Sequence, residues 1–369
     1  MTSSKINLLG LNNLALRQWM LDHGEKVFHA EQITKWVYQQ GVLSFDHMTN
    51  LGKNLRNTLN AEMEIRLPTL ADQQPSTDGT CKWVLRLDCG NCIETVFIPE
   101  KRRGTLCISS QVGCVLNCQF CSTATQGFNR NLAAWEITGQ ILFAAHALGI
   151  PKNHGQRVIT NVVFMGMGEP LLNFDPVVAA VDLMLDDNAF GISKRRVTLS
   201  TAGLVPQMDR LTSTLDISLA VSLHAPTNAL RDELVPLNKK YPIEELLLAC
   251  QRYIANKPHR KVTIEYVMLK DFNDSDQQAH ELAQLLKGLA CKINLIPFNP
   301  YPGTRFQCSD VLRMERFRDI LFAEGFTVII RRTRGGDIDA ACGQLVGRIT
   351  DRTRRNAQWQ AQLQKGITL

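Results

Sequence analysis

From residue 105 onward, strand-like and helix-like segments alternate, and this alternation allows few folds. Short apolar runs predict strands at 105–109, 159–165, 196–201, 217–223, 261–268 and 291–296. Helical periodicity predicts helices near 131–148, 174–185, 242–256, 275–288 and 309–324. Strands that alternate with helices form parallel β/α units, so an α/β fold with a partial (β/α)6 barrel is predicted. In such a barrel, the loops after the strands gather at one mouth.

The rest of the chain flanks this barrel. Residues 1–75 are predicted to form a small helical accessory domain, because the run FHAEQITKWVYQQ has apolar residues at helical spacing. Its basic side chains either bind RNA phosphates or form an ordinary solvated helix face. The run CKWVLRLDCGNCIETVFIP alternates and turns at 88–91, which predicts a β-hairpin linker over 76–104. The barrel domain is then expected over 105–345 and a basic tail over 346–369.

Three cysteines lie close together in the run GCVLNCQFC, namely Cys114, Cys118 and Cys121. Iron–sulfur clusters are normally held by four thiolates, so a local set of three predicts a cubane with one iron open to a substrate. A structural zinc site is the main alternative, but it needs a second Cys or His pair, and none follows. Three unligated core cysteines are a further alternative, which the polar, glycine-bounded loop disfavours.

Composition limits the class of protein further. The chain is 44% hydrophobic and 21% charged, as in an ordinary soluble enzyme. Its 41 Lys and Arg exceed its 35 Asp and Glu, which weakly favours a polyanionic partner. No signal pattern opens the chain, and no apolar run reaches the ~18 residues of a membrane span, so a cytosolic protein is predicted. In a reducing compartment, the 11 cysteines favour metal or redox chemistry over a disulfide scaffold.

Small or polar residues follow four of the predicted strands, where a ligand would bind. They are Gly166, Gly168 and Glu169 after the second strand, Ser200 after the third, Ser222, Leu223 and His224 after the fourth, and Asn299 after the sixth. Glycines let a ligand approach the backbone, and hydroxyl and imidazole groups suit a ribose or a carboxylate. Plainer interpretations are a tight turn for the glycines, a core histidine for His224 and a loop contact for Asn299.

The order of CxxxCxxC, GEP, a serine-tipped strand, SLHA and IPFNP resembles radical S-adenosylmethionine (SAM) enzymes, and specifically the RlmN family of RNA adenine-C2 methyltransferases. The similarity runs from FHAEQITKWVY to GGDIDAACGQL. It implies that Cys114, Cys118 and Cys121 hold a [4Fe–4S] cluster whose fourth iron binds SAM. It also implies SAM contacts at Gly168, Glu169, Ser200, Ser222, Leu223, His224 and Asn299.

The same resemblance assigns three catalytic residues. Cys342, in GGDIDAACGQL, matches the cysteine that carries the methyl group, Cys107 matches its resolving partner, and Glu94 resembles the proton acceptor. One SAM is expected to methylate Cys342, and the radical formed from a second to activate that methyl group for addition to adenine carbon 2. Attack of Cys107 on Cys342 then leaves a disulfide, which an external donor, such as a flavodoxin-type reductase system, must reduce. By residue type alone, a lone cysteine in a strand such as Cys107 is usually a core residue, and Glu94 could equally well be a solvent-facing hairpin residue.

Basic runs offer contacts to an RNA substrate: Arg331, Arg332 and Arg334, the segment 101–103, and the tail DRTRRNAQWQ. The resemblance implies 23S rRNA at the peptidyl-transferase centre and tRNA at the adenosine beside the anticodon, modified by a monomeric enzyme. Two alternatives remain at this point. One is a Cfr-like methyltransferase acting on adenine carbon 8, and the other is a non-catalytic Fe–S protein that binds RNA or senses redox state.

Overall fold

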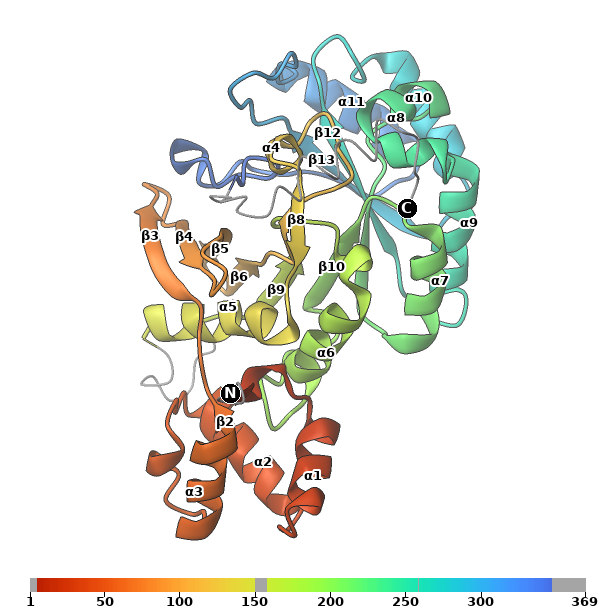
Figure 1. Ribbon diagram of the computed structural model, residues 1–369. Coiled ribbons are helices and arrows are strands. Elements are labelled where there is room, and N and C mark those ends of the chain that lie inside the picture. The colour runs from red at the N-terminus through yellow and green to blue at the C-terminus, as the bar shows by residue number, and fades with distance from the viewer. Residues whose placement is uncertain (1–4, 150–157, 258, 347–369) are drawn as a thin grey trace.

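A computed structural model describes residues 5–149, 158–257 and 259–346 (Figure 1). The predicted basic tail therefore lies outside the described residues, apart from Val346. None of the described helices is long and apolar enough to cross a membrane.

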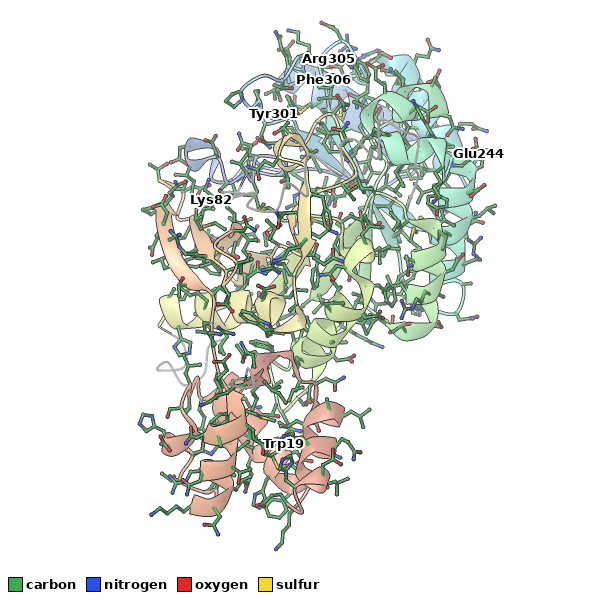
Figure 2. All side chains as sticks on the ribbon, viewed as in Figure 1. Trp19, Lys82, Glu244, Tyr301, Arg305 and Phe306 are labelled. Atoms are coloured by element: carbon green, nitrogen blue, oxygen red, sulfur yellow. The ribbon has the colours of Figure 1, made fainter. Side chains whose placement is uncertain are left out.

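The N-terminal region is helical, as predicted. It contains α1 (Asn13–Asp22), α2 (Phe28–Thr34) and α3 (Lys53–Glu62), with a π-helical turn at Lys35–Gln39 and short 3-10 turns at Leu8–Gly10 and Phe45–His47. The two-residue strands β1 (Ile6–Asn7) and β2 (Met63–Glu64) pair and close the region. These helices bury their own apolar core, which includes Ile33 and Val37 and reaches Trp19 (Figure 2). Phe28, the first apolar residue of that run and the first residue of α2, is 49% exposed.

One sheet forms the centre of the molecule, in the order β14-β13-β12-β11-β10-β9-β6-β5-β4-β3. Among the described residues, the strands from β14 to β6 are parallel. They are β6 (Arg103–Cys107), β9 (Asn161–Phe164), β10 (Val197–Thr201), β11 (Ser218–Ser222), β12 (Val262–Met268), β13 (Cys291–Pro297) and β14 (Val328–Ile330). The six predicted strands are confirmed, and β14 is an addition. The sheet has two edges, β14 and β3, so the barrel is incomplete.

Helices cover the outer face of the parallel strands (Figure 1). The predicted helices are α5 (Ala134–Ala147), α6 (Phe174–Leu185), α9 (Ile243–Ile254), α10 (Asp276–Leu286) and α11 (Val311–Ala323). Three shorter helices were not predicted: α4 (Ser122–Thr125), α7 (Val205–Thr214) and α8 (Asn228–Leu234). Every residue of β12 is buried, as expected of a strand with both faces covered.

An antiparallel extension continues the sheet beyond β6. The predicted hairpin is β4 (Cys81–Arg86) and β5 (Cys92–Glu100), and the Leu87 N–H donates to the Asn91 carbonyl at its turn. Strand β3 (Thr69–Pro75) pairs with β4, so residues expected at the end of the helical segment are part of the sheet. The domain boundaries given above stay predictions. This extension brings Glu94 and its neighbours to the side of the barrel.

Candidate active site

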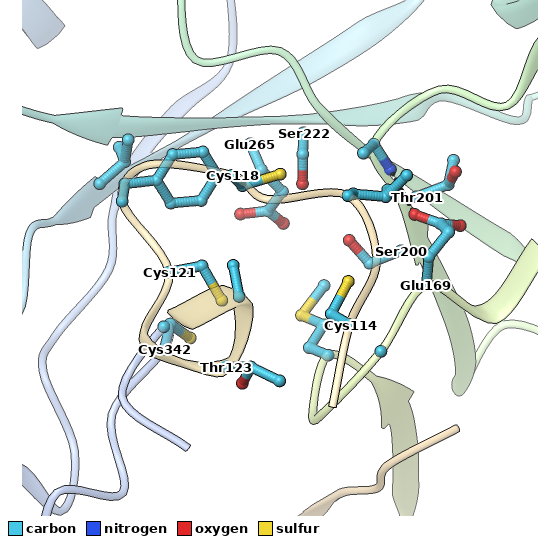
Figure 3. Close-up of a pocket in the computed structure, with 18 of the residues that line it drawn as sticks. Cys114, Cys118, Cys121, Thr123, Glu169, Ser200, Thr201, Ser222, Glu265 and Cys342 are labelled. Atoms are coloured by element: carbon cyan, nitrogen blue, oxygen red, sulfur yellow. Dashed lines mark hydrogen bonds between the residues drawn. The ribbon is translucent and has the colours of Figure 1, made fainter. Parts of the chain in front are cut away.

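The cysteine loop lies between β7 (Gln111–Gly113) and α4, and local hydrogen bonds fold it over the mouth of the barrel. The Cys114 N–H donates to the Gly127 carbonyl at 2.9 Å, and the Cys121 N–H to the Cys118 carbonyl at 3.1 Å. All three thiols border one pocket, the mouth pocket, whose opposite wall is formed by the ends of β9, β10 and β11. Figure 3 shows their sulfur atoms around the same space. The structure thus brings the predicted cluster ligands together.

The donor set of this loop fits a cluster better than a single ion. Burial raises the pKa of Cys114 to about 12. The pKa of Cys118 is also raised, mainly by burial and to a smaller extent by the neighbouring thiols of Cys114 and Cys121. Thiolates crowded in this way need a positive centre between them. Within the described ranges, no three His, Cys, Asp or Glu side chains are arranged to hold one metal ion. In a cubane each thiolate binds a different iron, so a wider spacing is required.

The turn after β9 needs its glycines for close packing. A Cβ atom on Gly168 would lie 2.4 Å from Gln111 Cβ, and its φ of +94° is unfavourable for any other residue. The Gln111 Oε1 accepts the Glu169 N–H at 2.9 Å. The carboxylate of Glu169 accepts the N–H groups of Ala202 at 2.8 Å and Leu171 at 3.1 Å. Glu169 therefore borders the mouth pocket and also ties the end of β9 to that of β10.

Burial raises the pKa of Glu169 to about 7, against the lowering effect of its backbone hydrogen bonds. Burial lowers the pKa of His224 to about 3, so this imidazole is neutral. Its Nδ1 accepts the Val267 N–H at 3.0 Å, which places the proton on Nε2. His224 has a φ of +62° and borders the mouth pocket beside Phe120. The core-histidine and ligand-contact interpretations are thus compatible.

Of the remaining predicted SAM contacts, Ser200 and Ser222 border the mouth pocket. Leu223 does not: its side chain is buried, and its carbonyl accepts a hydrogen bond from Arg231 Nε at 3.2 Å. Asn299 borders a second pocket instead, where its amide donates to the Cys342 carbonyl at 3.1 Å. The roles of these residues as SAM contacts stay predictions.

Arg231, on α8, was missed by sequence reasoning. Its buried guanidinium donates to the carbonyls of Ala202 at 2.6 Å and Ser222 at 3.1 Å, in addition to that of Leu223. It therefore holds together the ends of β10 and β11, two of the three strand ends that form the wall of the mouth pocket. Burial lowers its pKa to about 10. An arginine on a short helix gives no sequence signal for this role, because it resembles a solvated residue.

The second pocket, the lumen pocket, runs through the inside of the barrel. Its lining is charged, with the basic side chains Arg103, Lys292, Arg331, Arg332 and Arg334. Two of the predicted basic runs thus contribute to one surface, which suits the phosphates of an RNA.

Cys107 and Cys342 both border the lumen pocket, and Cys342 borders the mouth pocket as well. Burial, and then the nearby Cys342, raises the pKa of Cys107 to about 12. The Cys342 side chain is exposed, although protein surrounds it. Burial raises the pKa of its thiol, and the nearby charge of Arg331 partly opposes this increase. All 11 cysteines of the chain are free, so the structure does not contain the expected disulfide.

Glu94 borders neither pocket, but it is buried, so the solvent-facing interpretation is wrong. It lies 3.7 Å from the ammonium of the buried Lys82, and its Oε2 accepts the Val346 N–H at 3.2 Å. Lys82 also donates to the Asp339 carbonyl at 3.2 Å. The pair of Lys82 and Glu94 therefore anchors both sides of the loop that carries Cys342.

Comparison with known proteins gives the family. A model described as the ribosomal RNA large subunit methyltransferase N-terminal domain matches residues 6–65, and the radical SAM superfamily model matches residues 108–283. The chain is similar to a crystal structure of a radical SAM methyltransferase from Sphaerobacter thermophilus, with 42% identity and a TM-score of 0.86 over 92% of this chain and 99% of that one. SuiB from Streptococcus suis, solved with S-adenosylmethionine bound, has 16% identity and a TM-score of 0.45 over 61% of this chain and 49% of that one. Because the first similarity spans nearly the whole of both chains, the protein belongs to the RlmN family of radical SAM RNA methyltransferases.

Proposed function

We propose that this enzyme methylates carbon 2 of adenosine in 23S rRNA, at the peptidyl-transferase centre, and in tRNA, at the adenosine beside the anticodon. The observation that carries the proposal is the position of Cys342, which borders both the mouth pocket and the lumen pocket. A methyl carrier needs access to a donor on one side and to an acceptor on the other. The family and its N-terminal domain support RNA as the acceptor.

Cys114, Cys118 and Cys121 would hold a [4Fe–4S] cluster, and SAM would occupy the mouth pocket beside it. Once bound, the cluster and SAM supply the methyl group and the radical that activates it. The chain's own residues position these groups: Glu169 and Arg231 fix the strand ends, and the loop tied by Asn299 presents the Cys342 thiol between the pockets.

The residues in and beside the lumen pocket would bind the RNA and release the methylated base. Its arginines would hold the phosphates of an RNA whose target base has left its stack. Glu94 would take the ring proton of the adduct, and because it borders neither pocket, it would have to come into contact with the adduct when RNA binds. Attack of the Cys107 thiolate on Cys342 Sγ would then form a disulfide and break the bond from that sulfur to the methylene carbon, which would take a proton from solvent to become the methyl group. Two electrons from an external donor, such as a flavodoxin-type reductase system, would reduce the disulfide. A monomer in the cytosol is part of this proposal.

Isotope labelling tests the mechanism directly. The reconstituted enzyme is incubated without oxygen with RNA, reductant and SAM whose methyl group carries three deuteriums. Activation on Cys342 removes one deuterium, so the product methyl group should keep two. A product with three would contradict the use of a methyl carrier activated in this way. Mass spectrometry of the digested RNA also distinguishes 2-methyladenosine from the 8-methyladenosine of a Cfr-like enzyme.

A further inference from the structure

The loop over residues 339–346, here called the Cys342 loop, is hydrogen-bonded to the segment that carries the cluster cysteines. The hydroxyl of Thr123, on α4, donates to the Leu345 carbonyl at 2.5 Å, although the two residues lie 222 positions apart in the sequence. Both residues are buried, so loss of this bond would leave a buried acceptor without its donor. Thr123 borders the mouth pocket and Leu345 borders the lumen pocket, so the bond joins the linings of the two pockets.

A backbone hydrogen bond reinforces this contact. The Ser122 N–H donates to the Gly343 carbonyl at 2.7 Å. Ser122 is the first residue of α4, where an N–H group has no partner within the helix, so it can bond to another segment. A Cβ atom on Gly343, which has a φ of +84°, would lie 3.3 Å from the Phe120 carbonyl oxygen. The two segments therefore pack closely here, and Figure 3 shows Cys342 next to the short helix.

The contacts from α4 differ from the other anchors of the Cys342 loop in where they come from. Asn299 holds the loop from just after β13, and Lys82 holds it from β4. Thr123 lies two residues after Cys121, a predicted cluster ligand, and its hydroxyl lies near the Cys121 thiol as well. The bond from Thr123 therefore ties the position of the Cys342 loop to that of the cluster segment.

Methyl transfer to Cys342 depends on how these two segments are placed. In the proposed reaction, the Cys342 thiolate forms a bond to the methyl carbon of SAM while the bond from that carbon to the sulfonium breaks, which leaves S-adenosylhomocysteine. The cluster segment would place the donor, whereas the Cys342 loop places the accepting sulfur. Because the reacting atoms must be aligned at close range, a displacement of ~1 Å can slow such a step ~100-fold.

We propose that Thr123 is a positioning residue for the methyl carrier: its hydroxyl holds the Cys342 loop against the cluster segment in the arrangement that receives the methyl group. This rests on the proposed function, because it assumes that Cys342 accepts a methyl group from SAM. Thr123 acts through the Leu345 carbonyl, and the Ser122 N–H supports the same arrangement.

Thr123→Val tests the contact, because valine keeps the shape of threonine and removes only the hydroxyl. Hydrogen–deuterium exchange is measured without oxygen on the full-length protein carrying its cluster. Exchange over 339–346 should become ~10-fold faster, as expected for a lost buried hydrogen bond that holds a loop in place. Methyl transfer from SAM to Cys342, followed by mass spectrometry of the protein without RNA, should slow ~10-fold at saturating SAM. The affinity for S-adenosylhomocysteine, measured by calorimetry, should stay unchanged.

Three further variants make the result decisive. Thr123→Ser keeps the hydroxyl and should restore wild-type exchange and transfer. Thr125→Val is the matched control on the same helix, because the Thr125 hydroxyl donates within α4, to the Ser122 carbonyl at 2.7 Å, and borders neither pocket. Gly343→Ala disturbs the same contact from the other side, so it should reproduce both effects. It decides the matter if iron analysis shows that Thr123→Val has lost its cluster.

The outcomes separate this inference from the proposed function. If Thr123→Val exchanges and transfers as wild type does, or if its exchange rises evenly over the whole chain, Thr123 does not place the Cys342 loop, while the methyltransferase proposal stands. If the affinity for S-adenosylhomocysteine falls and exchange over 339–346 is unchanged, Thr123 acts on the cofactor and the inference is wrong. If wild-type protein transfers no methyl group to Cys342, the proposed function fails, and the inference fails with it.

Discussion

The mouth pocket and the lumen pocket differ in how their polar groups are satisfied. In the mouth pocket, backbone groups of the protein bond to the polar side chains, as for Glu169 and His224. In the lumen pocket, the lining is largely charged, and side chains pair with side chains: Arg334 lies 3.7 Å from Asp78, and Arg103 donates to Thr105 at 3.0 Å. The strand-end wall of the mouth pocket is therefore held by backbone hydrogen bonds of the fold, whereas its three cysteines and the basic side chains of the lumen pocket are the groups that would bind ligands. Cys342 lies where the two pockets meet.

The largest expected effect is the complete loss of methylation, and iron and SAM binding show whether the loss comes from the cluster or from the methyl carrier. Cys118→Ser should remove a cluster ligand, so bound iron and all methylation should be lost. Cys342→Ala should keep iron and SAM binding but lose methylation, because only the carrier is missing. Iron analysis, SAM binding and RNA methylation are measured on both variants. Cys89→Ser is the control, since Cys89 is exposed and borders neither pocket. Methylation by Cys342→Ala would refute its role.

A second prediction concerns the buried pair behind the Cys342 loop. Lys82→Met removes the buried ammonium that lies 3.7 Å from Glu94, which should lower the free energy of unfolding by about 3 kcal/mol. Adding Glu94→Gln removes the negative charge of the pair as well and should restore part of the loss. Denaturant unfolding of the single and double variants measures both effects. Equal stability of wild type and Lys82→Met would mean that this pair does not anchor the loop.

A substitution in the mouth pocket should be most destabilising where the backbone is crowded. Gly168→Ala and Gly288→Ala both place a side chain at positive φ, +94° and +86°. Only the first also meets a neighbour, Gln111, because nothing lies within 4 Å of the Cβ position at Gly288. Gly288→Ala should cost about 1 kcal/mol, and Gly168→Ala more, with weaker binding of S-adenosylhomocysteine as Glu169 is displaced. Denaturant unfolding and calorimetry would show whether the two variants differ.

The same contrast explains what sequence reasoning reached. The six parallel strands and the mouth residues were predictable, because motifs such as GEP and SLHA mark the ends of strands. Strand β14 and helix α8 are too short to show a period, with 3 and 7 residues. Arg231 gave no signal, because a charged residue in a short helix usually faces solvent. Its buried position depends on packing between distant segments, which spacing does not reveal.

The smallest effect concerns the protonation of the mouth pocket. Burial holds the folded-state pKa of His224 at about 3, below the 6.5 of an unfolded histidine. Between these values the unfolded chain binds the extra proton, so stability should fall as pH decreases below 6.5. Glu169 acts in the opposite sense: its folded pKa of about 7 exceeds 4.5, so its contribution falls as pH increases through that window.

Because these two contributions partly cancel in the wild-type protein, the difference between wild type and His224→Asn isolates that of the histidine. Asparagine tolerates the positive φ of +62° at this position. Between pH 4 and 6, the variant should lose stability less steeply on acidification than wild type, by up to about 1.4 kcal/mol per pH unit. Denaturant unfolding at several pH values measures both slopes. Equal slopes would mean that His224 is protonated in the folded enzyme, and the mouth pocket would then carry a charge that its backbone hydrogen bonds do not satisfy.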